Sequence, residues 1–286
     1  MSQSTPIVSV LTPIYNTNPQ HLRECIESVL NQTFSDFEFI ILNDSPDNTA
    51  LDDIVASYSD VRIRYVRNDV NMGISASRNR LLDMARGKYI AIFDHDDICM
   101  PDRLEKSVAI LDARPWVGVV SGWMHFFDGP DTDFVRQYPE NDTDIRTMLC
   151  QDCFVAHTAS MIRKSVLDRH NIRYESAFSP AEDYRLWARL MPYTQFYNIP
   201  CVLVRYRNHD NRTSISQQTR MRMCWRAISS DIRNSNPEYT RMLRRRDDMG
   251  ATTFRLRAFG VVPLLKIKNN RLFLFECIPL CRIMWQ

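Results

Sequence analysis

The amino-acid sequence predicts an α/β fold in which a mostly parallel sheet is flanked by helices. Over residues 6–97, apolar and β-branched runs alternate with amphipathic segments of helical spacing, and three of the apolar runs end in polar tips, "TPIYN", "NDSPDNT" and "DHDD". Strands that alternate with helices are typical of parallel sheets, and ligands of such sheets bind at the carboxyl ends of the strands. The polar tips therefore predict where a ligand binds.

Each element of the first part of the chain has a local reason. The first helix has Asn18 as its N-cap, Pro19 at its first position and apolar residues at helical spacing behind them. The last helix of this part is expected to be closed by Gly87. We expect strands at 6–15, 37–44, 62–69 and 89–97, and helices at 18–33, 50–59 and 75–88.

Beyond Pro101 the alternation loosens. The sequence predicts strands at 117–127 and 194–207, short helices at 144–150 and 160–170, and a helix at 180–191. No linker rich in glycine and serine separates this part from the first. We therefore expect one compact domain with two functional halves, the second added to a nucleotide-binding core.

Composition is that of a globular enzyme. The chain has 286 residues, of which 44% are hydrophobic and 24% charged, and it contains no apolar run long enough to span a bilayer. The first residues lack the basic region of a signal peptide, so we expect a cytoplasmic protein with reduced thiols. Cys150 and Cys153 form a C-x-x-C, but without a second pair it is a weak indication of a metal or redox site.

Charge is divided unevenly along the chain. From Ser216 onward there are 14 Lys and Arg against 5 Asp and Glu, a local net charge of +9, whereas the preceding residues carry a net charge of −7. The tail also contains two similar segments sixteen residues apart, which align Phe259 with Phe275 and Pro263 with Pro279. Aromatic and aliphatic residues flanked by cations are typical of segments at anionic membrane surfaces, and packing of the tail on the domain is the alternative.

The most unusual segment is "YIAIFDHDDICMPDRL", which places Asp94, Asp96 and Asp97 within four residues after an apolar run. Carboxylates this close repel one another unless donors, water or a bound cation offset the repulsion. By themselves the aspartates fit two interpretations, a divalent-ion site or acidic residues at the start of the next helix. Their position at a predicted strand end favours the ion site.

Four ordered segments are similar to motifs of the family 2 glycosyltransferases of the GT-A fold. They are "VSVLTPIYN", "SVLNQTFSDFEFIILNDS", "NMGISASRNRLLDMARGKYIAIFDHDD" and "AEDYRLWARL". The resemblance implies a Rossmann-like GT-A domain over residues 1–215, with a nucleotide-sugar-binding half at about 1–100 and an acceptor-binding half at 101–215. A basic helical or amphipathic tail follows at 216–286.

The resemblance also implies the reaction. A hexose or N-acetylhexosamine would pass from a UDP-sugar to a hydroxyl of a glycan or glycolipid, with inversion at the anomeric carbon. Mn²⁺ or Mg²⁺ would be bound mainly by Asp96, with Asp94 near the ribose or metal-bound water and His209 as a third ligand. Asp183 would be the general base, and Glu182 an acceptor-binding or structural neighbour. In the absence of the resemblance, these two acids fit the first turn of a helix.

Donor contacts follow from the same motifs. Asp44 matches an aspartate that accepts a hydrogen bond from uracil, although a pair of aspartates is usual and this chain has Asn43 in the first place. Asp44 as a turn residue and Trp187 as a core residue are the alternatives to ligand contacts. His95 is expected to point away from the metal. The implied nucleotide-sugar contacts are Thr12, Pro13, Tyr15, Asp44, Gly73, Arg78, Asp94 and His95.

Two other functions compete with glycosyl transfer. A sugar-1-phosphate nucleotidyltransferase would need a glycine-rich, basic phosphate loop near the N-terminus, and "TPIYNTNPQ" has none. A non-catalytic glycan- or metal-binding module would bind sugar without turning over a donor. Nucleic acid is not an expected partner, because the basic excess is confined to the tail. The expected partner of the tail is the anionic surface on the inner face of the cytoplasmic membrane.

Overall fold

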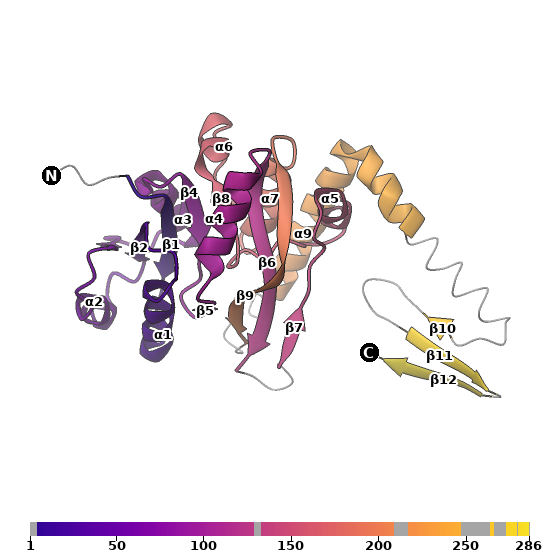
Figure 1. Ribbon diagram of the computed structural model, residues 1–286, viewed down its shortest axis with the longest axis horizontal. Coiled ribbons are helices and arrows are strands. Elements are labelled where there is room, and N and C mark those ends of the chain that lie inside the picture. The colour runs from indigo at the N-terminus through magenta and orange to yellow at the C-terminus, as the bar shows by residue number, and fades with distance from the viewer. Residues whose placement is uncertain are drawn as a thin grey trace. The chain divides into compact units, whose positions relative to one another are not determined.

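The computed structural model describes residues 5–128, 133–208 and 217–246, together with strands at 264–265, 273–278 and 280–285. The chain divides into two compact units, residues 1–230 and 231–286. The first unit is a sheet flanked by helices, in the order of elements labelled in Figure 1.

The first part of this unit is a parallel βα arrangement, as predicted. Four strands lie side by side in the order β3-β2-β1-β4, and each neighbouring pair is parallel. Three helices connect them along the chain. The bounds are β1 Val8–Ile14, α1 Pro19–Leu30, β2 Phe37–Asn43, α2 Ala50–Ala56, β3 Ile63–Arg67, α3 Ile74–Met84 and β4 Tyr89–Ile92.

Helix α1 begins as the sequence predicts. The Asn18 side chain accepts hydrogen bonds from the backbone N–H of Gln20 at 2.8 Å and of His21 at 3.4 Å, and Pro19 occupies the first turn. Its apolar stripe is buried under the sheet as Leu22, Cys25, Ile26 and Val29.

Helix α3 ends at Met84, before the expected stop at Gly87. Gly87 instead lies in the connection to β4, where its N–H donates to Ser9 Oγ at 2.8 Å. A Cβ at this position would lie 2.5 Å from the backbone nitrogen of Ser9. The glycine is therefore required by close approach to β1 and not by a helix cap.

The second part of the unit continues the same sheet with mixed directions. From β4 the order is β8-β6-β9-β5, with β7 beside β6, and only the β6–β9 pair is parallel. The bounds are β5 Ile98–Cys99, α4 Arg103–Ala113, β6 Val117–Phe127, β7 Phe134–Arg136, α5 Asp142–Leu149, β8 Met161–Arg163, α6 Lys164–Arg169, η1 Ser176–Phe178, α7 Glu182–Leu190 and β9 Gln195–Arg207.

One predicted element differs. Residues 160–170 were expected to form a single short helix, but Met161–Arg163 form strand β8 and α6 begins only at Lys164. Ile162 pairs with Ile90 of β4 on one side and with Val119 of β6 on the other. Pairing on both edges with buried strands outweighs the local preference of this short segment.

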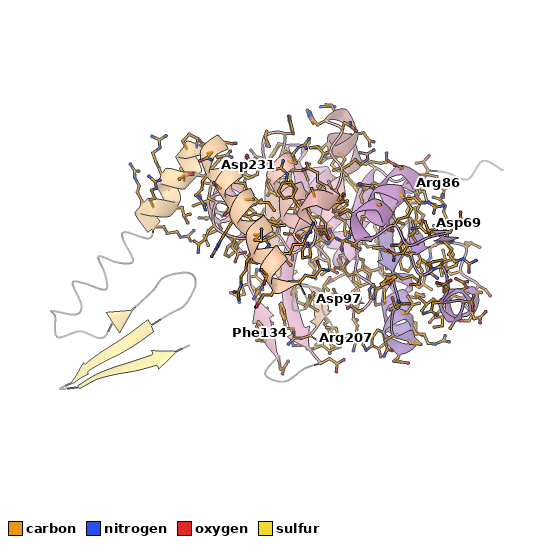
Figure 2. The ribbon with its side chains drawn as sticks, turned by 180° about the vertical axis from the view of Figure 1, so that it is seen from behind. Asp69, Arg86, Asp97, Phe134, Arg207 and Asp231 are labelled. Carbon is orange, nitrogen blue, oxygen red and sulfur yellow. The ribbon has the colours of Figure 1, made fainter. Side chains whose placement is uncertain are left out.

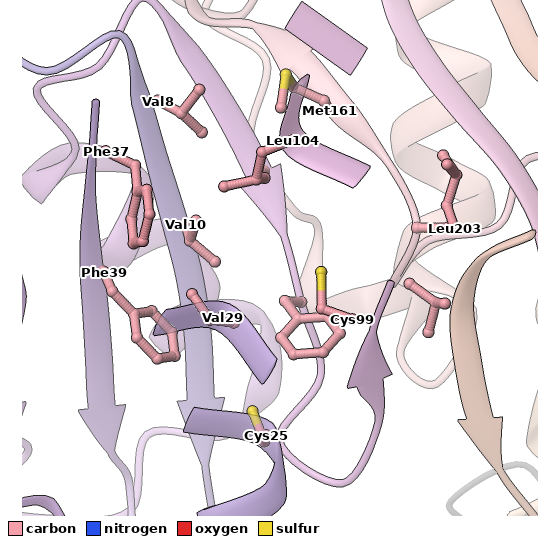
Figure 3. Close-up of a cluster of buried hydrophobic side chains, with 14 of the residues drawn as sticks. Val8, Val10, Cys25, Val29, Phe37, Phe39, Cys99, Leu104, Met161 and Leu203 are labelled. Carbon is pink, nitrogen blue, oxygen red and sulfur yellow. The ribbon is translucent and has the colours of Figure 1, made fainter. Parts of the chain in front are cut away.

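A hydrophobic core fills the space between the sheet and the helices. Figure 3 shows apolar side chains from β1, β2, α1, α4, β8 and β9 gathered in one cluster, among them Val8, Phe39, Leu104, Met161 and Leu203. Cys25 and Cys99 are part of this cluster, and they and the C-x-x-C residues Cys150 and Cys153 are free thiols.

The C-terminal part begins with helix α9, Gln218–Ser235, which is followed by a helix over 237–246. Strands β10 (Leu264–Leu265), β11 (Phe273–Ile278) and β12 (Leu280–Trp285) pair antiparallel in that order. Of the repeated residues, Phe259, Pro263 and Pro279 lie outside the described residues, and Phe275 is described only as part of the backbone of β11. Within the described ranges, no helix combines the length and the apolarity that crossing a membrane requires.

Candidate active site

The polar tips of β1, β2 and β4 meet at one edge of the sheet, because these strands are parallel neighbours. At the first tip, Thr12 and Pro13 are buried within β1, and Tyr15 is 54% exposed just after it. The N–H of Asn16 donates to Ser45 Oγ at 2.7 Å, which ties the first tip to the second. Of the three predicted contacts at this tip, only Tyr15 presents a large surface to solvent.

At the second tip, Asp44 orders the loop that leads into α3. Its Oδ1 accepts from the N–H of Met72 at 2.8 Å and from Asn68 Nδ2 at 2.6 Å, and its Oδ2 accepts from the N–H of Gly73 at 2.9 Å. Gly73 has φ of +78°, which favours glycine. Asp44 is thus a turn-forming residue in this structure, and its contact with a base stays a prediction.

The centre of the site is a buried ion cluster around Arg78 of α3. Arg78 Nη1 donates to Glu182 Oε1 at 2.6 Å, and Nη2 donates to Asp94 Oδ1 at 3.0 Å. Asp94 follows β4 and Glu182 is the first residue of α7, so one guanidinium joins the first part of the unit to a helix of the second. Burial disfavours the charged form of Arg78, but the charges of Asp94 and Glu182 outweigh it and raise the pKa of the guanidinium.

Asp94 is the most strongly stabilised carboxylate of this cluster. Burial alone would raise its pKa, but the Arg78 charge and, after it, the nearby His157 ring hold the pKa of Asp94 well below its ordinary value. Asp94 is therefore an anion at any physiological pH.

Two residues of this cluster were not expected from the sequence. His157 Nδ1 lies 4.0 Å from Asp94 Oδ2, and its Nε2 lies 2.9 Å from the hydroxyl of Tyr174. The Arg78 guanidinium lies over the Tyr174 ring, 5.5 Å from its centroid. Neither residue belongs to a recognisable motif, and both reach the site through tertiary packing.

The acidic turn after β4 places its three carboxylates differently. Asp94 faces Arg78 and Asp96 is half-buried, whereas Asp97 is buried and its Oδ1 accepts from the N–H of Arg207 at 2.9 Å. Burial raises the pKa of Asp97 well above its ordinary value, and the neighbouring charges of Asp96 and Asp94 raise it further. His95 lies between them, with its Nδ1 buried and without a hydrogen-bond partner in the described part of the chain.

The chemistry of this turn fits a divalent cation. Its ligands would be carboxylate oxygens, which Mg²⁺ and Mn²⁺ prefer, and a cation would offset the repulsion that adds to burial in raising the Asp97 pKa. Among the described residues no three His, Cys, Asp or Glu side chains form a closed metal site. That arrangement suits an ion that takes one or two carboxylates from the protein and its other ligands from substrate phosphates and water. His209 lies outside the described residues.

Asp183 directly follows Glu182 of the ion cluster. It is the second residue of α7, half-buried, and its Oδ1 accepts from the N–H of Tyr184 at 2.7 Å. Burial raises the pKa of Asp183; the charge of His157 lowers it, and that of Glu182 raises it. Glu182 forms a buried ion pair with Arg78, and Trp187 is fully buried in the core.

Comparison with known proteins gives consistent matches. The family model described as "Glycosyl transferase family 2" matches residues 9–170. The uncharacterized glycosyltransferase MJ1057 of Methanocaldococcus jannaschii is 34% identical over 73% of this chain and 74% of its own length. The amylovoran biosynthesis glycosyltransferase AmsE of Erwinia amylovora is 26% identical over 78% of this chain and 82% of its own.

Solved structures share the fold. TarS residues 1–349 of S. aureus, in complex with UDP-GlcNAc, superpose with a TM-score of 0.62 at 17% identity, over 79% of this chain and 66% of TarS. The mannosyltransferase PcManGT of Pyrobaculum calidifontis, in complex with GDP-Man and Mn²⁺, superposes with a TM-score of 0.56 at 19% identity, over 75% of this chain and 60% of its own. This chain thus spans less than two thirds of both structures. The likeness confirms the predicted GT-A fold.

Proposed function

Because the chain belongs to glycosyl transferase family 2, we propose that it moves a hexose or N-acetylhexosamine from a UDP-sugar to a hydroxyl of a glycan or glycolipid, with inversion. The observation that carries the proposal is the Arg78 cluster. It joins Asp94 of the acidic turn to Glu182, and Glu182 is adjacent to Asp183 on α7. A donor-binding turn and a base are thereby held at the edge of one sheet.

The donor is bound at the tips of β1 and β2. Tyr15 offers an exposed ring for a nucleotide base, and the Asp44 loop lies at the next tip. Retention of Asp44 favours uridine, as in the family motif, and TarS is a structural relative that binds UDP-GlcNAc. The buried Thr12 and Pro13 would support this surface from below.

Asp96 and Asp94 are the residues that would hold Mn²⁺ or Mg²⁺, with His209 as a further ligand. When bound, the ion neutralises the charge that develops on the diphosphate leaving group. PcManGT, which was solved with Mn²⁺, supports a divalent ion.

Asp183 acts on the acceptor. A sugar hydroxyl is a poor nucleophile at neutral pH, and a carboxylate that takes its proton as the new bond forms raises its reactivity. The raised pKa of Asp183 makes it a stronger base than an exposed carboxylate. The hydroxyl oxygen bonds to the anomeric carbon, the bond to the diphosphate breaks, and the proton goes to Asp183.

The acceptor and the location rest on the relatives and the tail. AmsE is named for amylovoran biosynthesis, and a surface polysaccharide or lipid-linked glycan is our proposal for this chain. The catalytic part is residues 1–215. The basic tail, 216–286, draws the protein to the anionic inner face of the cytoplasmic membrane.

A donor screen tests the proposal. Purified full-length protein is incubated with UDP-glucose, UDP-galactose, UDP-GlcNAc, UDP-GalNAc and GDP-mannose, with Mn²⁺ or with EDTA, and nucleotide release is measured. We expect slow release from at least one UDP-sugar, only with the metal. Release from GDP-mannose alone would overturn the choice of base, and binding of all donors without any release would favour a non-catalytic module.

A further inference from the structure

Arg207, the last residue of β9, is buried behind the acidic turn. Its side chain is 6% exposed, and Figure 2 shows it next to Asp97. A guanidinium this deeply buried needs acceptors for its donors, since an unpaired buried charge is strongly destabilising. The acceptors of the Arg207 guanidinium therefore indicate which segments this side chain positions.

The partners come from three distant parts of the chain. Arg207 Nη2 forms an ion pair with Glu24 of α1, and Nη1 forms one with Asp128, just after β6. Nε donates to the backbone carbonyl of Asp96 at 2.8 Å, and the backbone N–H donates to Asp97 Oδ1 at 2.9 Å. The end of β9 thus fastens the turn to α1 and to the end of β6.

We propose that Arg207 is a positioning residue for the metal-binding turn. It fixes the backbone of Asp96 through Nε and the side chain of Asp97 through its N–H, so that the Asp96 carboxylate is presented to the ion without rearrangement. The inference rests on the proposed function, because it assigns Arg207 a task only where Asp96 binds metal.

Electrostatics support the same role. Asp94, Asp96 and Asp97 repel one another. The Arg207 guanidinium brings a positive charge to this turn at the Asp96 carbonyl, whereas that of Arg78 contacts the Asp94 carboxylate. Residues that orient a metal ligand typically change metal affinity by about 10- to 100-fold when they are substituted. Arg207 is expected to fall within that range.

Lysine is a poor replacement at this position. The planar guanidinium donates in three directions at once, to Glu24, Asp128 and the Asp96 carbonyl, whereas an ammonium is a compact point charge on a flexible stem. Arg207→Lys keeps the charge and removes this fork. It separates the geometric contribution from the electrostatic one.

The strand also provides a matched control. Arg205 lies two residues earlier on β9, and its guanidinium lies over the Phe127 ring at 4.2 Å, where that of Arg207 lies at 4.7 Å. Arg205→Gln therefore removes a cation of the same strand and the same aromatic contact without touching the acidic turn.

The test measures the Kd of Mn²⁺ by calorimetry at saturating UDP, on full-length protein. Arg207→Gln should weaken Mn²⁺ binding by about 10- to 100-fold, Arg207→Lys by about tenfold, and Arg205→Gln by less than twofold. Turnover of Arg207→Lys should recover as Mn²⁺ is raised, because the ligands themselves are intact. A purely structural role would lower the melting temperature and leave the Mn²⁺ Kd unchanged.

An unchanged Mn²⁺ Kd in folded Arg207→Lys overturns the inference. This result decides the test by itself if Arg207→Gln does not fold. An equal loss in Arg205→Gln overturns it as well, because the effect would then be one of general charge. If the unsubstituted protein binds no Mn²⁺ in the presence of UDP, the proposed metal dependence itself is wrong.

Discussion

Substitution of Arg78 by methionine tests the ion cluster that joins the two halves of the catalytic unit. The Arg78 side chain is 10% exposed and that of Glu182 is 7% exposed, so the pair is buried, whereas the Asp94 side chain at 27% is better screened by water. Arg78→Met leaves the Glu182 carboxylate buried, and its Oε2 already has no hydrogen-bond partner among the described residues. Removal of one partner of a buried pair costs about 3–5 kcal/mol of unfolding free energy.

A double-mutant cycle isolates the pair. Glu182→Gln removes the charge at nearly constant volume. The double variant, Arg78→Met with Glu182→Gln, should therefore lose less unfolding free energy than the two single variants lose in sum, by about 1–3 kcal/mol. Urea unfolding followed by circular dichroism at pH 7 measures all four proteins. A loss below about 1 kcal/mol in Arg78→Met, or losses that simply add, would refute the buried-pair reasoning.

Four further predictions concern the chemistry and the tail. Asp183→Asn should lower kcat by about 10²-fold or more with little change in UDP affinity, and near-normal turnover would contradict its role as base. Because the base acts only when deprotonated and burial raises its pKa, kcat/KM should fall with decreasing pH at a value above the ordinary 3.8, and an acid limb at or below that value would contradict the assignment. EDTA should abolish transfer, Mn²⁺ should restore it, and Asp96→Ala should lose metal-supported donor binding; full activity in EDTA would exclude a metal role. A chain that ends after Gly250 should keep donor hydrolysis but lose salt-sensitive sedimentation with anionic liposomes, and an inactive or insoluble truncated chain would instead place the tail in the fold.

Local signals predict much of the fold. The Asn18 and Pro19 helix start, the alternation of strands and helices, and the polar strand ends act over a few residues, and the structure confirms them. The sequence also predicts that the acidic turn belongs to the ligand site, because the turn follows directly on a strand whose carboxyl end lies there. Where tertiary contacts compete with local preference the sequence misleads, as at Met161–Arg163, where pairing with two strands replaces the start of a helix.

The rest of the site depends on contacts between distant residues. In the sequence, nothing distinguishes Arg207 from the other cations of its strand, because its partners are separated from it by 79 to 183 residues along the chain. His157 and Tyr174 likewise reach Asp94 and Arg78 only through folding. For Asp44 the sequence motif predicts a ligand contact, but in the structure both of its carboxylate oxygens accept hydrogen bonds within the loop before α3.

The most direct test of the central claim is the anomeric configuration of the sugar released when water replaces the acceptor. The protein is incubated with Mn²⁺ and the UDP-α-sugar that it hydrolyses, and one-dimensional ¹H NMR follows the anomeric protons before mutarotation. Direct displacement at the anomeric carbon, with Asp183 as the base, predicts that the β-anomer forms first, and only with the divalent ion present. Initial release of the α-anomer, or release that EDTA leaves unchanged, would contradict an inverting, metal-dependent glycosyltransferase.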